Sequence, residues 1–427
     1  MIVSERTYRF SYNAWLFILA TSLIFRMPAT ILLIFFTVYN LCFYKHLLIT
    51  RKRLVYVGLI ATPFLLDILF LWNNEVLFEG LKHAEKRLSL FLLPVFILTQ
   101  NHRLNTILIL RFYAMAMTAI LSFCLVRFAV ISPELFTKYL HGIHLWEMGY
   151  KFAESIYTHA PALNMHVAFV VVINFFFFKE ALEKKQKAHL FWRFMFLVSS
   201  LIILFYINTR LAIVNAFLGI ILVSFYSGND FPRIFTIKKA LIGVSLFGIL
   251  AFGFVKIFPY SIEKFSTVTF GNLNKIGRLD EIKNPEKTIF NSLVTRLSIW
   301  KSGVELAQKH PLLGVGAADG KTELIHYYSE TNQKFLRKYE FPVHNQYLDF
   351  WIKFGVLGVV GILIYIGLFA YVGLRSRQVL CVFFFILFAS SNMVDDFLIR
   401  FDGIVFSALW LSIFTKHALD NPSCKLK

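Results

Sequence analysis

Two arginines and one histidine have sequence settings that could support chemistry. Arg210, in Asn208-Thr209-Arg210, separates two apolar runs with almost no loop between them. Such an arginine is costly beside hydrocarbon unless it faces a wet cavity or an anion, although an arginine that snorkels from a helix end is the simpler interpretation. Arg296 lies one helical turn before Trp300. It could also bind an anion, or simply belong to a solvated helix face.

His344 lies in Pro342-Val343-His344-Asn345, directly before an apolar and aromatic stretch. A neutral imidazole at a membrane-water boundary can act as a base near neutral pH, whereas a histidine that is merely hydrogen-bonded would be structural. The other histidines considered have no comparable setting, and their spacing matches no zinc pattern. They are His141, His144, His159, His310 and His326.

Motifs for nucleotide or metal-nucleotide binding are missing from the sequence. It contains no glycine-rich phosphate loop, no Walker lysine motif and no Asp-x-Asp pair, although Asp395 and Asp396 are adjacent. We therefore expect neither a metal nor a cofactor. An enzyme of this kind working outside the cytoplasm would need a donor that is already activated and already in the membrane.

The composition indicates that these residues are carried by a polytopic membrane protein. Hydrophobic residues make up 57% of the 427 positions and charged residues 16%, and the mean hydropathy is +0.63. The formal charge of +19 is attributed to lysines and arginines that set the membrane topology and contact lipid headgroups, because no basic cluster falls on a soluble module. The sequence thus predicts contact with a lipid bilayer and no nucleic-acid binding.

Apolar runs long enough for helical spans recur along the whole chain. We predict an all-α fold with about twelve transmembrane helices. The predicted segments are 11–25, 28–44, 54–72, 88–99, 106–131, 161–178, 190–207, 211–227, 238–258, 354–373, 378–394 and 403–417.

The distribution of lysine and arginine predicts the orientation of these helices. With the N-terminus inside, nineteen such residues fall on the cytoplasmic side and eight in the short outer connections. Both termini are then cytoplasmic, and residues 259–344 form an outer loop. The predicted organisation is about nine transmembrane helices in 1–258, a large periplasmic loop in 259–353, and about three helices in 354–427.

The latter half of this loop has helical periodicity. Leu293, Leu297, Trp300, Val304 and Ala307 recur at helical spacing. Pro311 and the Gly314-Val315-Gly316 turn should end the helix.

Three ordered motifs resemble those of the O-antigen ligase and polymerase superfamily. They are Arg296-x-x-x-Trp300, His310-Pro311-Leu312-Leu313-Gly314-Val315-Gly316 and His344-Asn345, and Gly355-Val356-Leu357-Gly358 is similar to the helix start that follows in that family. Asn208-Thr209-Arg210 resembles its Thr-Ser-Arg-Gly segment, with Leu211 in place of the glycine, and Glu85-Lys86-Arg87-Leu88-Ser89 through Pro94 resembles another recurrent segment. The motif region is about 200–360.

The resemblance implies a GT-C-type membrane glycosyltransferase that uses an undecaprenyl-diphosphate-linked glycan as donor. Arg210 and Arg296 would hold the diphosphate without a metal, and His344 would remove the proton of the acceptor hydroxyl, with inversion at the anomeric centre. The acceptor would be lipid A-core or another glycan. Trp300, His310, Pro311, Gly314, Gly316 and Asn345 would support the site.

Other functions stay open at this level. A ligase and a polymerase share the arginines and the histidine, and differ in the acceptor that they admit. A lipid-linked oligosaccharide flippase or another transporter would also fit a basic chain of twelve helices, but such folds usually show two related halves. We find no such relation between halves here. A scaffolding membrane protein is the remaining alternative. The expected location is the bacterial inner membrane, with the active site facing the periplasm.

Overall fold

The computed structural model describes residues 4–140, 145–226, 271–290 and 292–421, together with Phe252 and Lys256. In this part of the chain regular structure is helical, with one isolated antiparallel bridge between Leu47 and Gln100. The predicted segment 238–258 lies outside the described residues except at Phe252 and Lys256. His141, His144 and the start of the predicted loop (259–270) also lie outside them.

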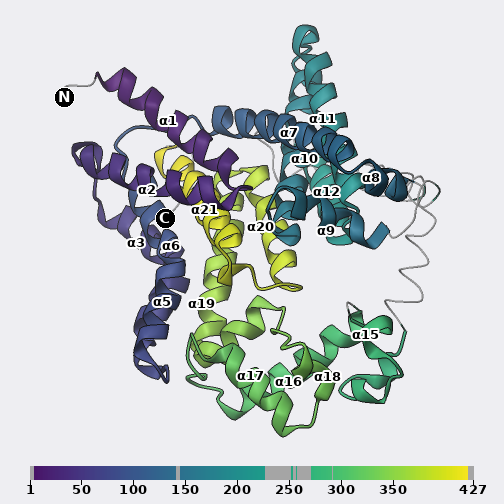
Figure 1. Cartoon of the computed structure of the whole chain (residues 1–427). Coiled ribbons are helices and arrows are strands. Elements are labelled where there is room, and N and C mark those ends of the chain that lie inside the picture. The colour runs from purple at the N-terminus through teal and green to yellow at the C-terminus, as the bar shows by residue number, and fades with distance from the viewer. Residues whose placement is uncertain are drawn as a thin grey trace.

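The helices form three groups along the chain (Figure 1). The first contains α1 (Glu5–Ser22), α2 (Arg26–Cys42), η1 (Tyr44–His46), α3 (Arg51–Ile60), α4 (Thr62–Leu69), η2 (Leu71–Asn73), α5 (Leu77–Arg87), α6 (Ser89–Leu98), α7 (Thr106–Ile131), α8 (Pro133–Leu140), α9 (Leu145–Ser155), α10 (Ala160–Glu183), α11 (Lys187–Ile207) and α12 (Arg210–Phe225). The loop unit contains η4 (Leu273–Lys275), η5 (Leu279–Glu281), α15 (Pro285–Thr288), α16 (Leu293–Lys309), α17 (Gly320–Glu330) and α18 (Lys334–Lys338). The C-terminal group contains α19 (Gln346–Ser376), α20 (Val379–Asn392), η6 (Phe397–Ile399) and α21 (Phe401–Asp420).

Every predicted apolar segment within the described ranges coincides with helix, but not always with one unbroken helix. Segment 54–72 is divided into α3 and α4, because Pro63, in the first turn of α4, lacks the N–H that would continue α3. Among the described helices, α7, α10, α11 and α19 are long and apolar enough to cross a membrane. The predicted all-helical fold is confirmed for the described residues, while the count of twelve spans stays a prediction.

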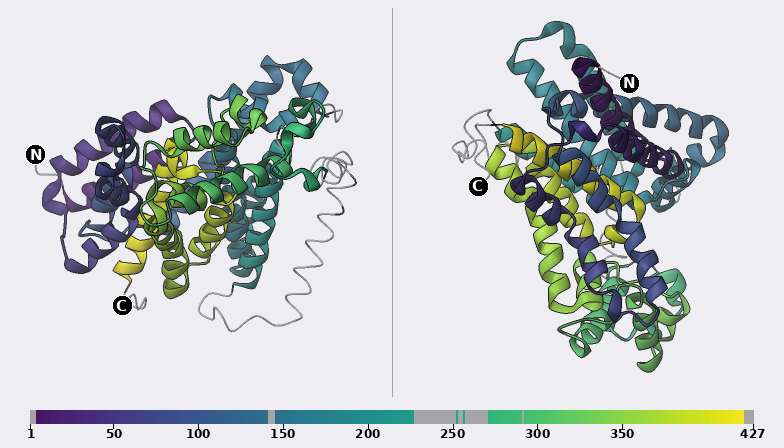
Figure 2. Two further views of the ribbon diagram at one scale, coloured as in Figure 1. Left: turned by 90° about the horizontal axis from the view of Figure 1, so that it is seen from below. Right: turned by 90° about the vertical axis from the view of Figure 1, so that its left-hand side faces the viewer.

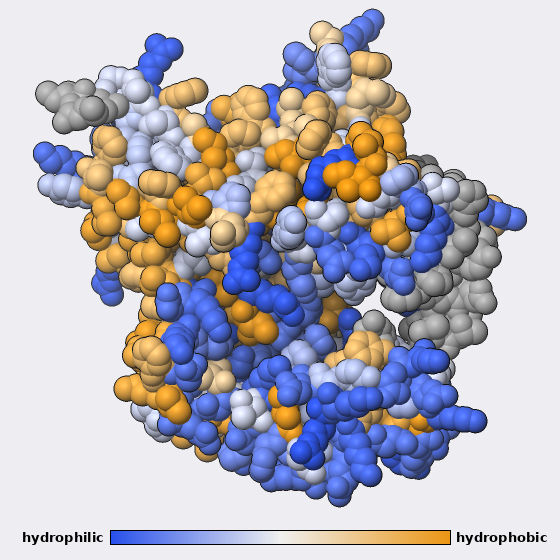
Figure 3. Space-filling model, in the orientation of Figure 1, coloured by the Kyte–Doolittle hydropathy of each residue, from blue (hydrophilic) through white to orange (hydrophobic). Residues whose placement is uncertain are grey.

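Two hydrophobic cores stabilise the described part of the chain. The larger joins helices of the first and last groups, and α10 is the most enclosed of the four long apolar helices. The smaller core lies in the loop unit, where Val294, Ile299 and Leu306 of α16 pack with Tyr328. Figure 3 shows the loop unit as a largely hydrophilic surface below a surface rich in apolar residues.

The predicted loop helix is present as α16, with a different buried face. Ser292 begins it, and its side chain accepts a hydrogen bond from the N–H of Thr295. The buried face combines apolar residues with small ones such as Ser298, Ser302 and Gly303, whereas Trp300 is only partly buried. The apolar spacing therefore predicted the helix but not the orientation of its packing.

Helix α19 connects the loop unit to the apolar helices (Figure 2). It begins at Gln346 and is kinked at Gly355, where φ is 61° and ψ is −149°. The predicted end of the loop after residue 353 falls two residues before this kink. Leu348 and Ile352 before the kink pack in the loop core, and Ile362 and Tyr365 after it pack in the larger core.

Candidate active site between the loop unit and the apolar helices

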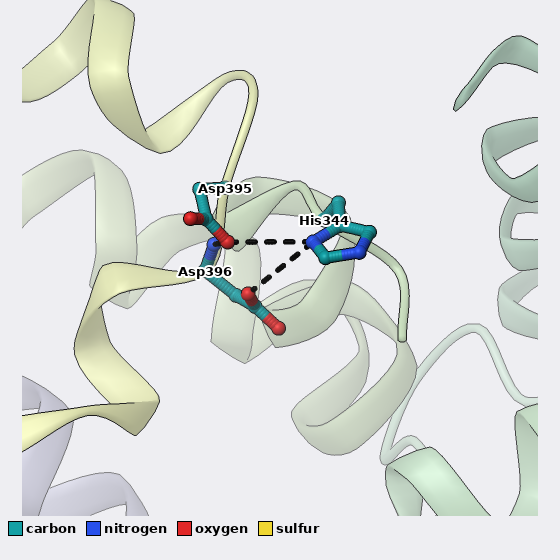
Figure 4. Close-up of side chains that lie close together, drawn as sticks. All are labelled: His344, Asp395 and Asp396. Carbon is teal, nitrogen blue, oxygen red and sulfur yellow. Dashed lines mark hydrogen bonds and ion pairs between the residues drawn. The ribbon is translucent and has the colours of Figure 1, made fainter. Parts of the chain in front are cut away.

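His344 lies beside two carboxylates at the junction of the loop unit and the apolar helices. Its Nδ1 atom is 3.4 Å from Oδ1 of Asp395 and 3.9 Å from Oδ1 of Asp396 (Figure 4). The histidine side chain is 28% exposed, whereas the aspartate side chains are 10% and 1% exposed. The imidazole can therefore be reached by a substrate, while the carboxylates support it from the protein side.

Asn345 fixes the backbone that carries His344. Its Oδ1 atom accepts hydrogen bonds from the N–H groups of Tyr347 and Leu348, both at 3.1 Å, and so caps α19. His344, just before this cap, has a φ of 48°, which is uncommon for a residue with a side chain. The His-Asn pair thus combines a chemical group with the residue that holds the start of its helix.

The segment that carries the two aspartates is held from two sides through Leu398. The N–H of Leu398 donates to Oε1 of Gln346 at 2.6 Å, and its carbonyl accepts a hydrogen bond from Nε of Arg87 at 2.8 Å. Arg87 is fully buried and also donates to Oδ1 of Asp67 at 2.9 Å. Arg87, from the Glu85-Lys86-Arg87 segment, therefore has a positioning role that its sequence alone did not reveal.

The two aspartates have opposite electrostatic tendencies. Burial would raise the pKa of Asp395, but the interactions with His344 and Asp396 outweigh it, so this pKa lies well below its usual range. Burial, and then the neighbouring Asp395, raise the pKa of Asp396 well above its usual range. The arrangement favours a charged Asp395 beside a protonated Asp396, since two adjacent buried carboxylates repel each other when both are ionised.

A second polar pair extends the same cluster. Asp349 and Lys353 of α19 form an ion pair at 2.8 Å, and Nε2 of Gln346 donates to Asp349 at 3.0 Å. Both charged groups influence the pKa of Asp396. The buried carboxylate thus lies within a polar network and not in an apolar core.

His159 and Arg400 were not singled out from the sequence, yet the structure places them near this cluster. Burial, followed by the charge of Arg400, lowers the pKa of His159 to about 4, and Asp395 and His344 also act on it. The Nε atom of Arg400 is buried and has no hydrogen-bond partner among the described residues. Each residue lies just before an apolar helix, but this position alone does not distinguish it from other helix ends.

The same three side chains could also hold a metal ion. Ligand atoms of His344, Asp395 and Asp396 lie within 4.8 Å of one another. An imidazole and two carboxylates suit several divalent cations. The expectation of a metal-free site therefore stays a prediction that requires a direct test.

The two predicted arginines are not bonded to His344. Arg296, in the first turn of α16, is partly buried, and its guanidinium makes no hydrogen bond or ion pair with any described residue. Arg210 begins α12, directly after the left-handed Asn208 (φ 51°) and Thr209, and is also partly buried. Among the described residues, His344 forms neither a hydrogen bond nor an ion pair with either arginine.

The segment from Pro311 to Gly316 is bonded to α19 where that helix is kinked. The N–H groups of Val315 and Gly316 donate to the carbonyls of Ile352 and Lys353 at 2.9 and 3.1 Å, and the N–H of Val356 donates to the Pro311 carbonyl at 2.9 Å. These bonds satisfy backbone groups that the kink removes from the helical pattern.

The glycines of this contact are required by space and by backbone conformation. Gly314 has a φ of 67°, and a Cβ atom there would overlap the backbone of Lys353. Gly355 has a φ of 61°, and its Cβ atom would overlap the backbone of Leu312. A Cβ atom at Gly316 would lie 2.6 Å from the carbonyl oxygen of Asn73. The glycine motif therefore has an architectural role.

The remaining predicted support residues are less closely involved. His310 and Pro311 are exposed at the end of α16. Trp300 packs against the loop core, and its buried Nε1 atom has no hydrogen-bond partner among the described residues. Among the described residues, none of these three forms a hydrogen bond or an ion pair with His344.

The connection between α4 and α5 attaches the first group of helices to the loop unit. Nδ2 of Asn73 donates to the Leu313 carbonyl at 3.1 Å, and Oδ1 of Asn74 accepts from the N–H of Ala318 at 2.8 Å. The N–H of Glu75 donates to Oδ2 of Asp319 at 2.9 Å. These contacts hold the loop unit against the helices that carry Asp67 and Arg87.

The fold and the site together define a helical membrane protein with a polar cluster of His344, Asp395 and Asp396 at the base of the loop unit. Residues 195–363 match the family model described as O-antigen ligase, so this region of the chain is similar to the O-antigen ligase superfamily. No curated protein matches the chain. This family is glycosyltransferase-like, and the match to it supports a function of the O-antigen ligase or polymerase type. Arg210, Arg296 and His344 fall inside the matched region, whereas Asp395 and Asp396 lie beyond it.

Proposed function

We propose that the protein is an O-antigen ligase-type glycosyltransferase that moves a glycan from undecaprenyl diphosphate to an acceptor hydroxyl, with lipid A-core as the leading acceptor. The observation that carries the proposal is the His344–Asp395 contact at 3.4 Å, formed within a chain that has an O-antigen ligase domain. In this proposal the site faces the periplasm, the protein spans the inner membrane, and both termini are cytoplasmic.

His344 acts as the general base. With the proton on Nδ1 directed to the carboxylate of Asp395, the lone pair on Nε2 is available to the acceptor hydroxyl. A charged Asp395 stabilises the imidazolium that forms, as a carboxylate does for the histidine of a hydrolytic triad. A protonated Asp396 avoids a second negative charge beside it.

The atoms, electrons and proton of the transfer step are all accounted for without a cofactor. The acceptor oxygen attacks the anomeric carbon, and the bond from that carbon to the phosphate oxygen breaks. The electron pair leaves with undecaprenyl diphosphate, and the acceptor proton goes to His344. Attack opposite the leaving group inverts the anomeric centre.

Arg210 and Arg296 bind the diphosphate in this proposal. A guanidinium group is planar and permanently charged, so it can hold a phosphate through two hydrogen bonds while negative charge grows on the leaving group. Arg296 has no ion pair with a described residue that a phosphate would have to displace.

The direct test uses purified protein, lipid-linked donor and lipid A-core. The His344→Ala variant should lose turnover while donor affinity stays nearly unchanged, because a base acts on the acceptor. His326→Ala, at an exposed histidine of α17, is the matched control and should retain activity. A well-folded His344→Ala protein with normal transfer would end the assignment of the base.

The lipopolysaccharide of a deletion strain separates the related functions. Loss of all capped lipid A-core with accumulation of undecaprenyl-linked polymer identifies a ligase. Lipid A-core that still carries a single glycan repeat in the deletion strain identifies a polymerase. Transport of the lipid-linked glycan without any transfer by the purified protein would identify a flippase instead.

A further inference from the structure

An open groove between α3 and α19 is not used by the proposed reaction. It has a volume of about 710 Å³, within the range of roughly 300–1,000 Å³ that is usual for ligand sites. Its walls are mainly aliphatic, with Val55 and Leu59 on α3 facing Leu363, Ile364 and Leu368 on α19. Several of these side chains are well exposed, including Val55 at 54% and Leu363 at 54%.

One end of the groove is basic. Arg51 and Lys52, in the first turn of α3, belong to its lining, and the described lining residues include no acidic side chain. Arg375 in the last turn of α19 adds a third cation at this end, since its guanidinium carbon lies 5.9 Å from the ring centre of Tyr371, another lining residue. The neighbouring Arg53 has a different role, because it pairs with Asp420 at 3.2 Å.

The basic and apolar parts of the groove are separated along the helix axes. Leu59 lies eight residues after Arg51, and Leu363 lies eight residues before Tyr371, which corresponds to about 12 Å of helix in each wall. The middle of the α19 wall is open at Gly367, where an added Cβ atom would meet nothing within 4 Å. The groove therefore fits a ligand with an anionic head and a long apolar chain.

We propose that this groove binds an anionic glycerophospholipid of the surrounding bilayer, with its phosphate at Arg51 and Lys52 and an acyl chain along Leu59 and Leu363. The exposed apolar walls favour a lipid over a soluble anion, because a soluble ligand would leave them uncovered. Basic residues at a membrane surface attract anionic lipids in this way.

The position of the groove separates this lipid from the proposed glycan donor. His344 precedes the start of α19, whereas Tyr371 lies near its end, at most roughly 40 Å away by helical rise. In the topology predicted from lysine and arginine, Arg51 and Lys52 lie on the cytoplasmic side, so the basic end of the groove belongs to the leaflet opposite the proposed active site. The binding proposal does not depend on the transfer reaction.

Native mass spectrometry of the full-length protein in detergent tests the proposal. Phosphatidylglycerol should bind at least about tenfold more tightly than phosphatidylcholine, and inorganic phosphate alone should not displace it. Two variants should each weaken phosphatidylglycerol binding about tenfold: Arg51→Gln with Lys52→Gln, which removes the charges, and Gly367→Leu, which fills the groove.

Matched controls lie outside the groove. Lys45→Gln with Arg103→Gln removes two exposed charges, and Gly58→Leu adds a side chain at another glycine with open space, so both should bind as the wild type does. Equal affinity for the two lipids, full displacement by phosphate, or unchanged binding in both groove variants would overturn the proposal.

A measurement on the wild type covers the case in which a variant does not fold. Photo-crosslinking phosphatidylglycerol should label peptides containing residues 51–59 and 363–371. Labelling confined to other peptides would also overturn the proposal.

Discussion

The Nδ1 atom of His344 lies 3.4 Å from Oδ1 of Asp395, a residue 51 positions later in the chain. The histidine belongs to the end of the loop unit and the aspartate to the connection between α20 and η6. The proposed base from one unit is therefore held beside a carboxylate from the other, so the proposed catalysis depends on how the two units are joined.

Replacing Asp395 tests this relationship. Asp395→Asn keeps the size of the side chain but removes the charge that stabilises the imidazolium, so turnover should fall by about a hundredfold or more. Donor affinity should change little. The measurement is steady-state transfer with separate donor binding, and Glu330→Gln in the exposed part of the loop unit is the control. Normal turnover in folded Asp395→Asn protein would contradict the orienting role.

Conservative replacement of the arginines tests the diphosphate clamp. Arg210→Lys and Arg296→Lys keep a positive charge but lose the planar fork, so activity should fall by about tenfold to a thousandfold in each. Arg210→Ala should also weaken donor binding, because the charge contact exists before the bond breaks. An Arg210 that only snorkels would tolerate lysine, and this outcome in the transfer assay would remove it from the site.

Chelation distinguishes the arginine clamp from a metal centre at His344, Asp395 and Asp396. If the arginines carry the diphosphate charge, purified enzyme should keep its activity in excess EDTA. Strict dependence on added Mg²⁺ or Mn²⁺ would reject the clamp and assign the three clustered side chains as ligands. Direct metal analysis of the purified protein provides the independent measurement.

Reporter fusions test the orientation predicted from lysine and arginine. A reporter fused after Lys309, at the end of α16, should be active only outside the cytoplasm. One fused after Lys187, at the start of α11, should be active only inside. The reverse pattern at either position would remove the basis for a periplasmic active site.

The glycine at the kink of α19 should matter for stability. Gly355→Ala places a Cβ atom against the backbone of Leu312 at a positive φ, and should reduce the free energy of unfolding by about 2–4 kcal/mol. Gly367→Ala in the same helix has open space and should be neutral or slightly stabilising. Thermal unfolding in detergent compares the two, and equal stability would show that the kink is not constrained.

The sequence by itself determined the class of protein and most of its helices. A chain in lipid must satisfy its backbone internally, so long apolar runs are read directly as helices. The spacing of apolar residues from Leu293 to Ala307 predicted α16, because the periodicity of a helix is visible in a short stretch of sequence. The ordered motifs also indicated the superfamily that the family model then confirmed.

The surroundings of His344 were decided only by the tertiary structure. Asp395 and Asp396 were visible as adjacent acids, but no local pattern indicated that they lie beside His344, or that Arg87 holds Leu398 behind them. His159 and Arg400 were hidden for the same reason. These pairings join residues far apart in the chain, and the packing of whole helices brings them together, whereas sequence periodicity reports only what lies on one helix.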